Sequence, residues 1–178
     1  MSPTGFQPLA GGSKSMTHEE LRKAAVRWLT RTLRCGVVLS EMVSAAGDIP
    51  DAIGWKYGFS YMVECKASRS DFHANKAKPH ERANSGVGCN RFFLCVPEII
   101  KVEDLESSDY GLLWIGESGV IRIKKQPVVR ETNHRKEICM LTSALRRVRT
   151  REFLTINVLD DENESDATIP VPEAAQTA

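Results

Sequence analysis

Apolar residues recur with a helical period in the first ordered part of the chain. The first helix is predicted to begin after Thr17, because the S/T-x-x-E spacing from Thr17 to Glu20 has the form of a capping box. We expect it to end at Cys35-Gly36. Its apolar stripe consists of Leu21, Ala25, Trp28, Leu29 and Leu33, and its basic stripe of Lys23, Arg27, Arg31 and Arg34.

Short β-rich runs follow this helix. The predicted strands are Val37–Met42, Ile49–Trp55, Tyr61–Ala67, Arg91–Val96, Leu112–Ile115 and Val120–Lys124. A second helix is expected from about Asp71 to near Pro79. A closing helix is expected to face the core with Ile138, Leu141, Leu145 and Val148. The order α-β-β-β-α-β-β-β-α predicts an α/β fold with a mixed central β-sheet flanked by helices.

The composition is that of one soluble globular domain, with 42% apolar and 26% charged residues among 178. We expect a disordered segment at 1–15, the folded domain at 16–158 and an acidic disordered tail at 159–178. No run of about 18 apolar residues is present and the first residues lack the apolar core of a secretory signal. These features exclude a membrane-spanning chain and predict a cytoplasmic one.

The formal net charge of +1 conceals an uneven distribution along the chain. The tail carries no Lys or Arg and six acids, namely Asp160, Asp161, Glu162, Glu164, Asp166 and Glu173. Without them, 24 basic residues stand against 17 of the 23 acids, so the rest of the chain has a charge of +7. A basic body is compatible with a partner that carries phosphates.

Cysteines and histidines do not indicate a metal or nucleophile site by their spacing. No C-x-x-C pair occurs among Cys35, Cys65, Cys89, Cys95 and Cys139, which predicts free thiols rather than disulfides or zinc. The histidines His18, His73, His80 and His134 are not spaced as ligands.

Two acids in neighbouring strands carry the strongest chemical signal. Asp51 follows Pro50, and Glu64-Cys65-Lys66 ends the next strand. If the hairpin between them turns at Tyr57-Gly58, Asp51 lies directly across from Glu64, and Glu64 and Lys66 share one face. Two opposed carboxylates repel, and a hard divalent cation turns this penalty into a binding site. A slip of one residue in the register would place the acids on opposite faces.

These residues resemble the PD-(D/E)XK nuclease superfamily, whose signature is the Pro50-Asp51 and Glu64-x-Lys66 pattern. The run Glu64-Cys65-Lys66-Ala67-Ser68-Arg69-Ser70-Asp71-Phe72, together with Glu41, Arg91-Phe92-Phe93-Leu94 and Gly111-Leu112-Leu113, is similar to the MmcB-like DNA-repair branch and related phage and bacterial proteins. The resemblance covers roughly residues 17–149. It implies a restriction-endonuclease-like α-β-β-β-α-β core.

The resemblance also implies roles for individual residues. Asp51, Glu64 and the backbone carbonyl of Cys65 would hold Mg²⁺ or Mn²⁺, and Lys66 would position the attacking water and offset charge at the phosphate. The further acid of the superfamily usually comes from the first helix, which nominates Glu20. Glu41 is the alternative, and Glu20 has a competing role as the capping-box partner of Thr17.

Contacts to the DNA backbone are expected from basic residues that follow the motif. The candidates are Arg69, Lys76, Lys78 and Arg82. A solvated charged surface explains the same residues equally well.

The resulting expectation is a metal-dependent DNA endonuclease or DNA-processing enzyme in repair, recombination or phage–host conflict. A catalytically inactive nuclease-like module that binds DNA or a protein is the first alternative, and a nuclease acting on RNA is the second. DNA is the expected partner, the resemblance is compatible with a homodimer or a larger assembly, and no membrane partner is expected.

Overall fold

The computed structural model describes residues 15–44, 46–75, 86–147 and 154–156. Its elements are α1 (His18–Arg27), η1 (a π-helix, Trp28–Thr32), β1 (Val37–Leu39), β2 (Ala52–Lys56), β3 (Phe59–Cys65), α2 (Arg69–Asn75), β4 (Asn90–Cys95), η3 (a 3₁₀-helix, Val102–Leu105), β5 (Gly111–Ile115), β6 (Ile121–Lys125), α3 (His134–Arg146) and β7 (Leu154–Ile156). Apart from β7, which was not predicted, the order of the major helices and strands agrees with the sequence pattern.

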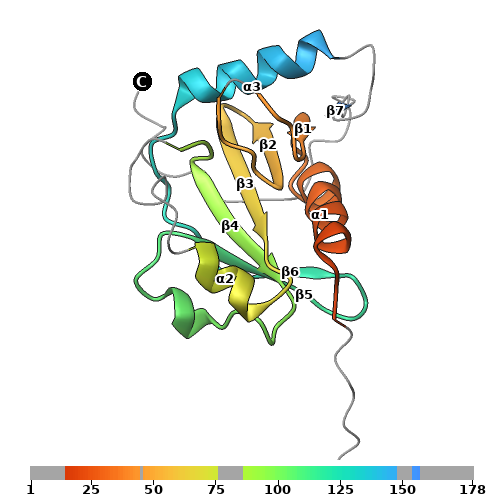
Figure 1. The fold of residues 1–178 in the computed structure, drawn as a ribbon, viewed down its shortest axis with the longest axis vertical. Helices are drawn as coiled ribbons and strands as arrows, with labels where there is room; N and C mark the ends of the chain where they lie inside the picture. Colours follow the sequence, from red (N-terminus) through yellow and green to blue (C-terminus); the bar gives the residue numbers. More distant parts are fainter. Residues whose placement is uncertain (1–14, 45, 76–85, 148–153, 157–178) are drawn as a thin grey trace, which may run out of the picture.

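One mixed sheet organises the protein (Figure 1), with strand order β6-β5-β4-β3-β2-β1-β7. The pairs β3–β4 and β4–β5 are parallel, whereas β1, β2, β6 and β7 pair antiparallel with their neighbours. The predicted mixed α/β architecture is therefore confirmed.

Helices cover both faces of this sheet. On one face, α1 and η1 bury Leu21, Leu29 and Leu33 against strand residues such as Val63 and Leu94. On the other face, a second cluster contains Phe72 of α2 and Met140 of α3, with the strand residues Ile53 and Phe93. Because strand side chains alternate, Val63 and Met62 belong to opposite clusters.

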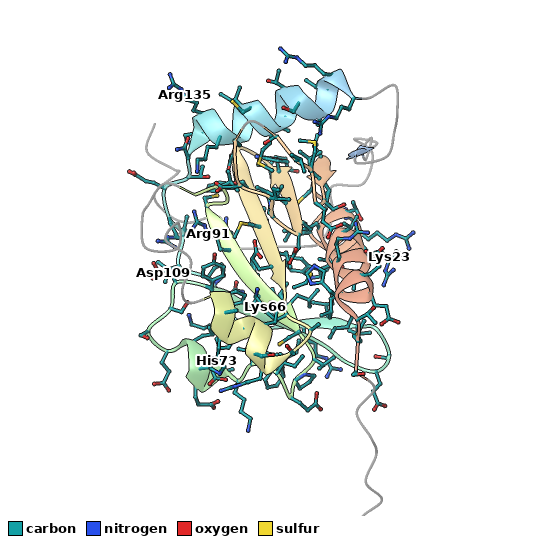
Figure 2. All side chains as sticks on the ribbon, in the orientation of Figure 1. Lys23, Lys66, His73, Arg91, Asp109 and Arg135 are labelled. Carbon is teal, nitrogen blue, oxygen red and sulfur yellow. The ribbon has the colours of Figure 1, made fainter. Side chains whose placement is uncertain are left out.

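The first helix follows the prediction in register and polarity. Thr17 and Glu20 form the expected capping box. The predicted apolar stripe is buried and the basic stripe is exposed, with Lys23 on the outer side of α1 (Figure 2). After Arg27 the hydrogen bonding widens into the π-helical turn Trp28–Thr32, where Trp28 packs edge-on against Phe92.

The closing helix presents a different face to the core from the predicted one. Ile138 and Leu145 are 61% and 67% exposed, and Leu141 is only half-buried. Glu137, Met140 and Ala144 are buried instead. The reason is Glu137, whose carboxylate accepts hydrogen bonds from three distant segments and so draws its own side of α3 inward. Val148, the fourth predicted core residue, lies outside the described residues.

Three other sequence predictions concern the ends of the chain, the cysteines and membrane-spanning helices. The terminal segments 1–14 and 157–178 lie outside the described residues. All five cysteines are free, as predicted. Within the described ranges, no helix combines the length and apolarity needed to cross a bilayer.

Candidate functional site

The β2–β3 hairpin has the predicted register. Tyr57 and Gly58 form its two-residue turn with positive φ values of 49° and 79°, the conformation that primed turns require. The last pair of the ladder is Ala52 with Val63. One step further, Asp51 and Glu64 are therefore opposite each other at the end of the hairpin.

Asp51 is held at this strand end by the backbone of the neighbouring strand. Its Oδ2 accepts a hydrogen bond of 2.7 Å from the N–H of Cys65. This contact continues the β2–β3 pairing with a side chain where the β2 backbone has ended. Pro50 lies directly before Asp51, and its carbonyl accepts from the N–H of Glu41 at 3.2 Å. The segment after β1 is thereby brought to the same corner.

Glu41 reaches this corner in a left-handed backbone conformation, with φ of 46°. Its Oε2 lies 3.1 Å from Nε of Arg22 on α1. Arg22 also donates to Ser40 Oγ at 3.1 Å and contacts Glu19. Hydrogen bonding to Glu19, assisted by the charge of Glu41, raises the pKa of the Arg22 guanidinium, which stays a fixed positive charge beside the acids.

His18 joins the two acids from the first turn of α1. Its Nε2 lies 3.2 Å from Oδ1 of Asp51 and 3.9 Å from Oε1 of Glu41. One potential ligand atom from each of the three residues lies within 4.8 Å of the others. The spacing of the histidines along the chain gave no sign that His18 reaches this cluster. The available signal was helical: His18 lies four residues before Arg22 and so shares its face of α1.

Glu20, the acid nominated from the first helix, lies elsewhere. Its Oε2 accepts from the backbone N–H and the hydroxyl of Thr17 at 2.8 and 2.9 Å. It also lines a pocket of about 230 Å³ with Val96 and Ile115, which lie at the ends of β4 and β5. Of the two alternatives for the further acid, the structure brings Glu41 to Asp51 and uses Glu20 as the helix cap.

Lys66 is buried, with 3% of its surface exposed, and lies in the interior next to α2 (Figure 2). Its backbone N–H donates to Leu94 at 2.9 Å and so extends the β3–β4 pairing. Its Nζ is 3.6 Å from Oδ1 of Asp71 and 5.9 Å from the centre of the Phe93 ring. The carboxylate and the ring face give this buried ammonium partial compensation.

Cys65 contributes through its backbone. Its side chain is buried on the α1 face of the sheet. Burial, reinforced by the negative charges of Asp51 and Glu64, raises the pKa of the thiol well above its usual range. A neutral thiol is a poor metal ligand. The expected role of the Cys65 carbonyl stays a prediction.

Of the four residues predicted to contact DNA, the structure describes Arg69. Both terminal nitrogens of Arg69 lie close to the Asp104 carboxylate, at 2.5 and 2.6 Å, and one also donates to the Ile99 carbonyl at 2.9 Å. A phosphate at this place would compete with Asp104. Lys76, Lys78 and Arg82 lie outside the described residues.

The donor set at the corner suits a divalent cation. Two carboxylates and one imidazole nitrogen lie side by side; the register puts Glu64 on the adjacent strand end, but its carboxylate is not among the ligand atoms grouped within 4.8 Å. Carboxylate oxygens bind Mg²⁺ and Mn²⁺, and imidazole binds transition-metal ions. Arg22 is the cation beside Glu41, so Asp51, Glu41 and Arg22 together carry a formal charge of −1 when His18 is neutral.

Comparisons with known proteins bear on the fold alone. No protein-family model matches the chain, and a search of curated proteins finds no match. Among solved structures the chain is similar to SPO1766, a protein of unknown function from Silicibacter pomeroyi. The TM-score is 0.55 at 21% sequence identity, and the match covers 77% of this chain and 92% of the other. The α/β architecture is thus shared with an experimentally determined protein.

Proposed function

We propose that this protein is a divalent-metal-dependent nuclease that hydrolyses phosphodiester bonds in DNA. The proposal depends on one observation: Asp51, Glu41 and His18 converge within 4.8 Å at the strand end that also carries Glu64-x-Lys66. Acids placed together at a partly exposed corner repel one another in the absence of a cation. This repulsion between the acids supports a cation-binding role for the corner.

The residues around the corner have complementary tasks in this proposal. Asp51 and Glu41 would hold the ion, and Glu64 from the next strand is the further ligand that the sequence resemblance implies. A bound divalent ion polarises a phosphoryl oxygen and lowers the pKa of its water. Lys66 stabilises negative charge that develops at the scissile phosphate. The backbone N–H of Cys65 keeps the Asp51 carboxylate oriented toward the corner.

The element order supports a restriction-endonuclease-like core and membership of the PD-(D/E)XK superfamily. In α1-β1-β2-β3-α2-β4, the aspartate directly precedes β2 and the Glu-x-Lys sequence runs across the end of β3. This is the arrangement that the sequence resemblance implies. The basic charge of the body favours DNA as the substrate, with repair, recombination or phage–host conflict as the setting.

A panel of end-labelled DNA structures tests the proposal: duplex, single strand, flap and four-way junction, each with Mg²⁺, Mn²⁺ or a chelator. We expect metal-dependent cleavage of at least one DNA, abolished by chelator and by Lys66→Met. The methionine keeps most of the buried stem volume and removes the ammonium. Cleavage by Lys66→Met at the wild-type rate would contradict the role given to Lys66.

A nuclease-like module without catalysis is the second candidate. The observation in its favour is that Lys66 faces Asp71 at 3.6 Å while it is 3% exposed, so its ammonium serves an internal contact. Calorimetric titration with Mn²⁺, combined with the cleavage panel, separates the two. DNA binding without metal binding or cleavage would favour the module.

A further inference from the structure

His18 differs in chemistry from the oxygen ligands around it. It is the first residue of α1, so Thr17 and the capping box fix its backbone. Its side chain is 43% exposed, and that of Asp51 is 16% exposed. An incoming ion therefore reaches the imidazole from solvent, while the carboxylate beside it stays anchored to Cys65.

Two donor–donor distances at the corner fall within the range that pairs of ligands span around a six-coordinate ion. Metal–ligand bonds of about 2.1 Å put neighbouring octahedral ligands roughly 3 Å apart and opposite ones roughly 4.2 Å apart. The His18 Nε2 to Asp51 Oδ1 distance is 3.2 Å and the His18 Nε2 to Glu41 Oε1 distance is 3.9 Å. The first distance is close to the adjacent spacing and the second lies between the adjacent and opposite spacings, so an ion needs only small side-chain adjustments.

Arg22 weakens the attraction that the corner exerts on an ion that binds by electrostatics alone. Arg22 lies 3.1 Å from the second oxygen of Glu41 and neutralises part of its charge. Mg²⁺ prefers oxygen ligands and depends strongly on their negative charge. First-row transition-metal ions gain more from an imidazole nitrogen than Mg²⁺ does.

From this geometry we infer that His18 is a nitrogen ligand that makes the site prefer a first-row transition-metal ion, with Mn²⁺ as the practical probe, over Mg²⁺. The inference rests on the proposed function, which gives the corner its reason to hold an ion. It specifies which metal that function uses. The competing explanation is that His18 only forms a metal-free ion pair with Asp51.

Calorimetric titration of the full chain with MnCl₂ and with MgCl₂ measures this preference. We expect wild type to bind Mn²⁺ at least about tenfold more tightly than Mg²⁺, and His18→Gln to lose most of that ratio. His18→Glu replaces the imidazole nitrogen with a carboxylate oxygen and should shift the affinity ratio toward Mg²⁺. Glu20→Gln is the matched control: it alters an acid two residues away on α1, keeps a capping-box side chain and should leave both affinities unchanged.

Pulsed EPR of the Mn²⁺-loaded protein gives a readout that does not depend on activity. We expect coupling between the Mn²⁺ electron spin and an imidazole ¹⁴N in wild type and in Glu20→Gln, and its loss in His18→Gln. Far-ultraviolet circular dichroism verifies that each variant is folded. Bound Mn²⁺ without nitrogen coupling, or a His18→Gln protein that binds both ions like wild type, would overturn the inference.

The remaining outcomes separate this inference from the proposed function. Metal-dependent DNA cleavage together with unchanged Mn²⁺ binding by His18→Gln rejects His18 as a metal ligand and supports the proposed nuclease activity. Nitrogen coupling without cleavage of any DNA in the panel supports the ligand and rejects the nuclease. Absence of Mn²⁺ binding to wild type rejects the ligand, and absence of both Mn²⁺ and Mg²⁺ binding rejects the nuclease as well.

Discussion

Two acidic centres lie at opposite ends of the β2–β3 hairpin, and they handle negative charge differently. At the turn end, Glu137 of α3 contacts Trp55 and Ser60. At the other end, Asp51 lies across from Glu64. Ser60 and Glu64 are separated by about 13 Å of strand. Figure 1 shows α3 at one end of the sheet and the start of α1 at the other.

Glu137 is satisfied by neutral donors. It is 6% exposed, and it accepts from Trp55 Nε1 at 3.1 Å, Ser60 Oγ at 2.7 Å, the Gly88 N–H at 2.9 Å and Thr132 Oγ1 at 2.5 Å. Burial, the largest single influence, raises the pKa of Glu137, but these hydrogen bonds together lower the pKa below its usual value. Every oxygen has its partners, so this carboxylate acts as a structural joint.

The Asp51 corner differs in each respect. Its donors and acceptors are mostly ionisable side chains at partly exposed positions, and the acids Asp51 and Glu41 meet one arginine and one histidine. The comparison teaches that burial alone does not mark a functional acid. An acid surrounded by neutral donors holds the fold, whereas the acids gathered at the Asp51 corner are candidate ligands of an ion.

The largest expected effect is on catalysis, from Asp51→Asn. Asparagine keeps an oxygen that accepts from the Cys65 N–H but removes the charge that holds the ion. We expect cleavage to fall by about 10² to 10⁴-fold and the free energy of unfolding to change by less than about 1 kcal/mol. Cleavage kinetics and urea unfolding measure the two quantities; a variant that loses activity because it unfolds would not support the assignment.

The next effect is on stability, from Glu137→Ala at the other centre. It leaves the Trp55, Ser60 and Gly88 donors buried without their acceptor, which should cost about 3–5 kcal/mol. Denaturant unfolding measures this loss. Mn²⁺ affinity of the folded fraction should stay at the wild-type value, and a specific loss of Mn²⁺ binding would mean that the two centres are coupled.

Acid sensitivity gives a smaller effect with a defined sign. Because the folded-state pKa of Glu137 is lowered from 4.5, its contribution to stability is fully present above that unfolded-state value. It is lost as the pH falls through the lower folded-state pKa. Urea unfolding between pH 7 and pH 3 should therefore show a shallower stability loss for Glu137→Gln than for wild type. Parallel curves would contradict the lowered pKa.

The smallest effect is expected on the outer face of α3. Ile138→Ser and Leu145→Ser change side chains that are 61% and 67% exposed, so each should alter the free energy of unfolding by about 0.5 kcal/mol or less. Met140→Ala, on the buried face, should cost about 2–5 kcal/mol. Thermal or urea unfolding compares them. A large loss of unfolding free energy in Leu145→Ser would contradict this and support the helix face predicted from the sequence.

The hairpin was predictable from the sequence because its determinants are local. A glycine in a two-residue turn and the flanking β-rich runs define the pairing of Ala52 with Val63. The position of Asp51 opposite Glu64 then follows by counting. The strand itself begins only at Ala52, later than predicted.

The faces of the helices depended on distant partners. The capping box located the start of α1, but helical periodicity alone does not say whether His18 or Glu20 meets the strand ends. In α3 two stripes compete, and apolar spacing favours Ile138 and Leu145. The hydrogen bonds from Trp55, Ser60 and Gly88 to Glu137 turn the other face of α3 toward the core. These donors are distant in the sequence, so no local pattern predicts them.

The most direct test of the central claim is the Mn²⁺ dependence of DNA cleavage, measured side by side for wild type, Asp51→Asn and Glu137→Gln and normalised to folded protein. We predict cleavage by wild type and Glu137→Gln that rises with Mn²⁺ and stops with chelator, and none above background for Asp51→Asn. Equal cleavage by Asp51→Asn and wild type, or cleavage that persists in chelator, would contradict the account.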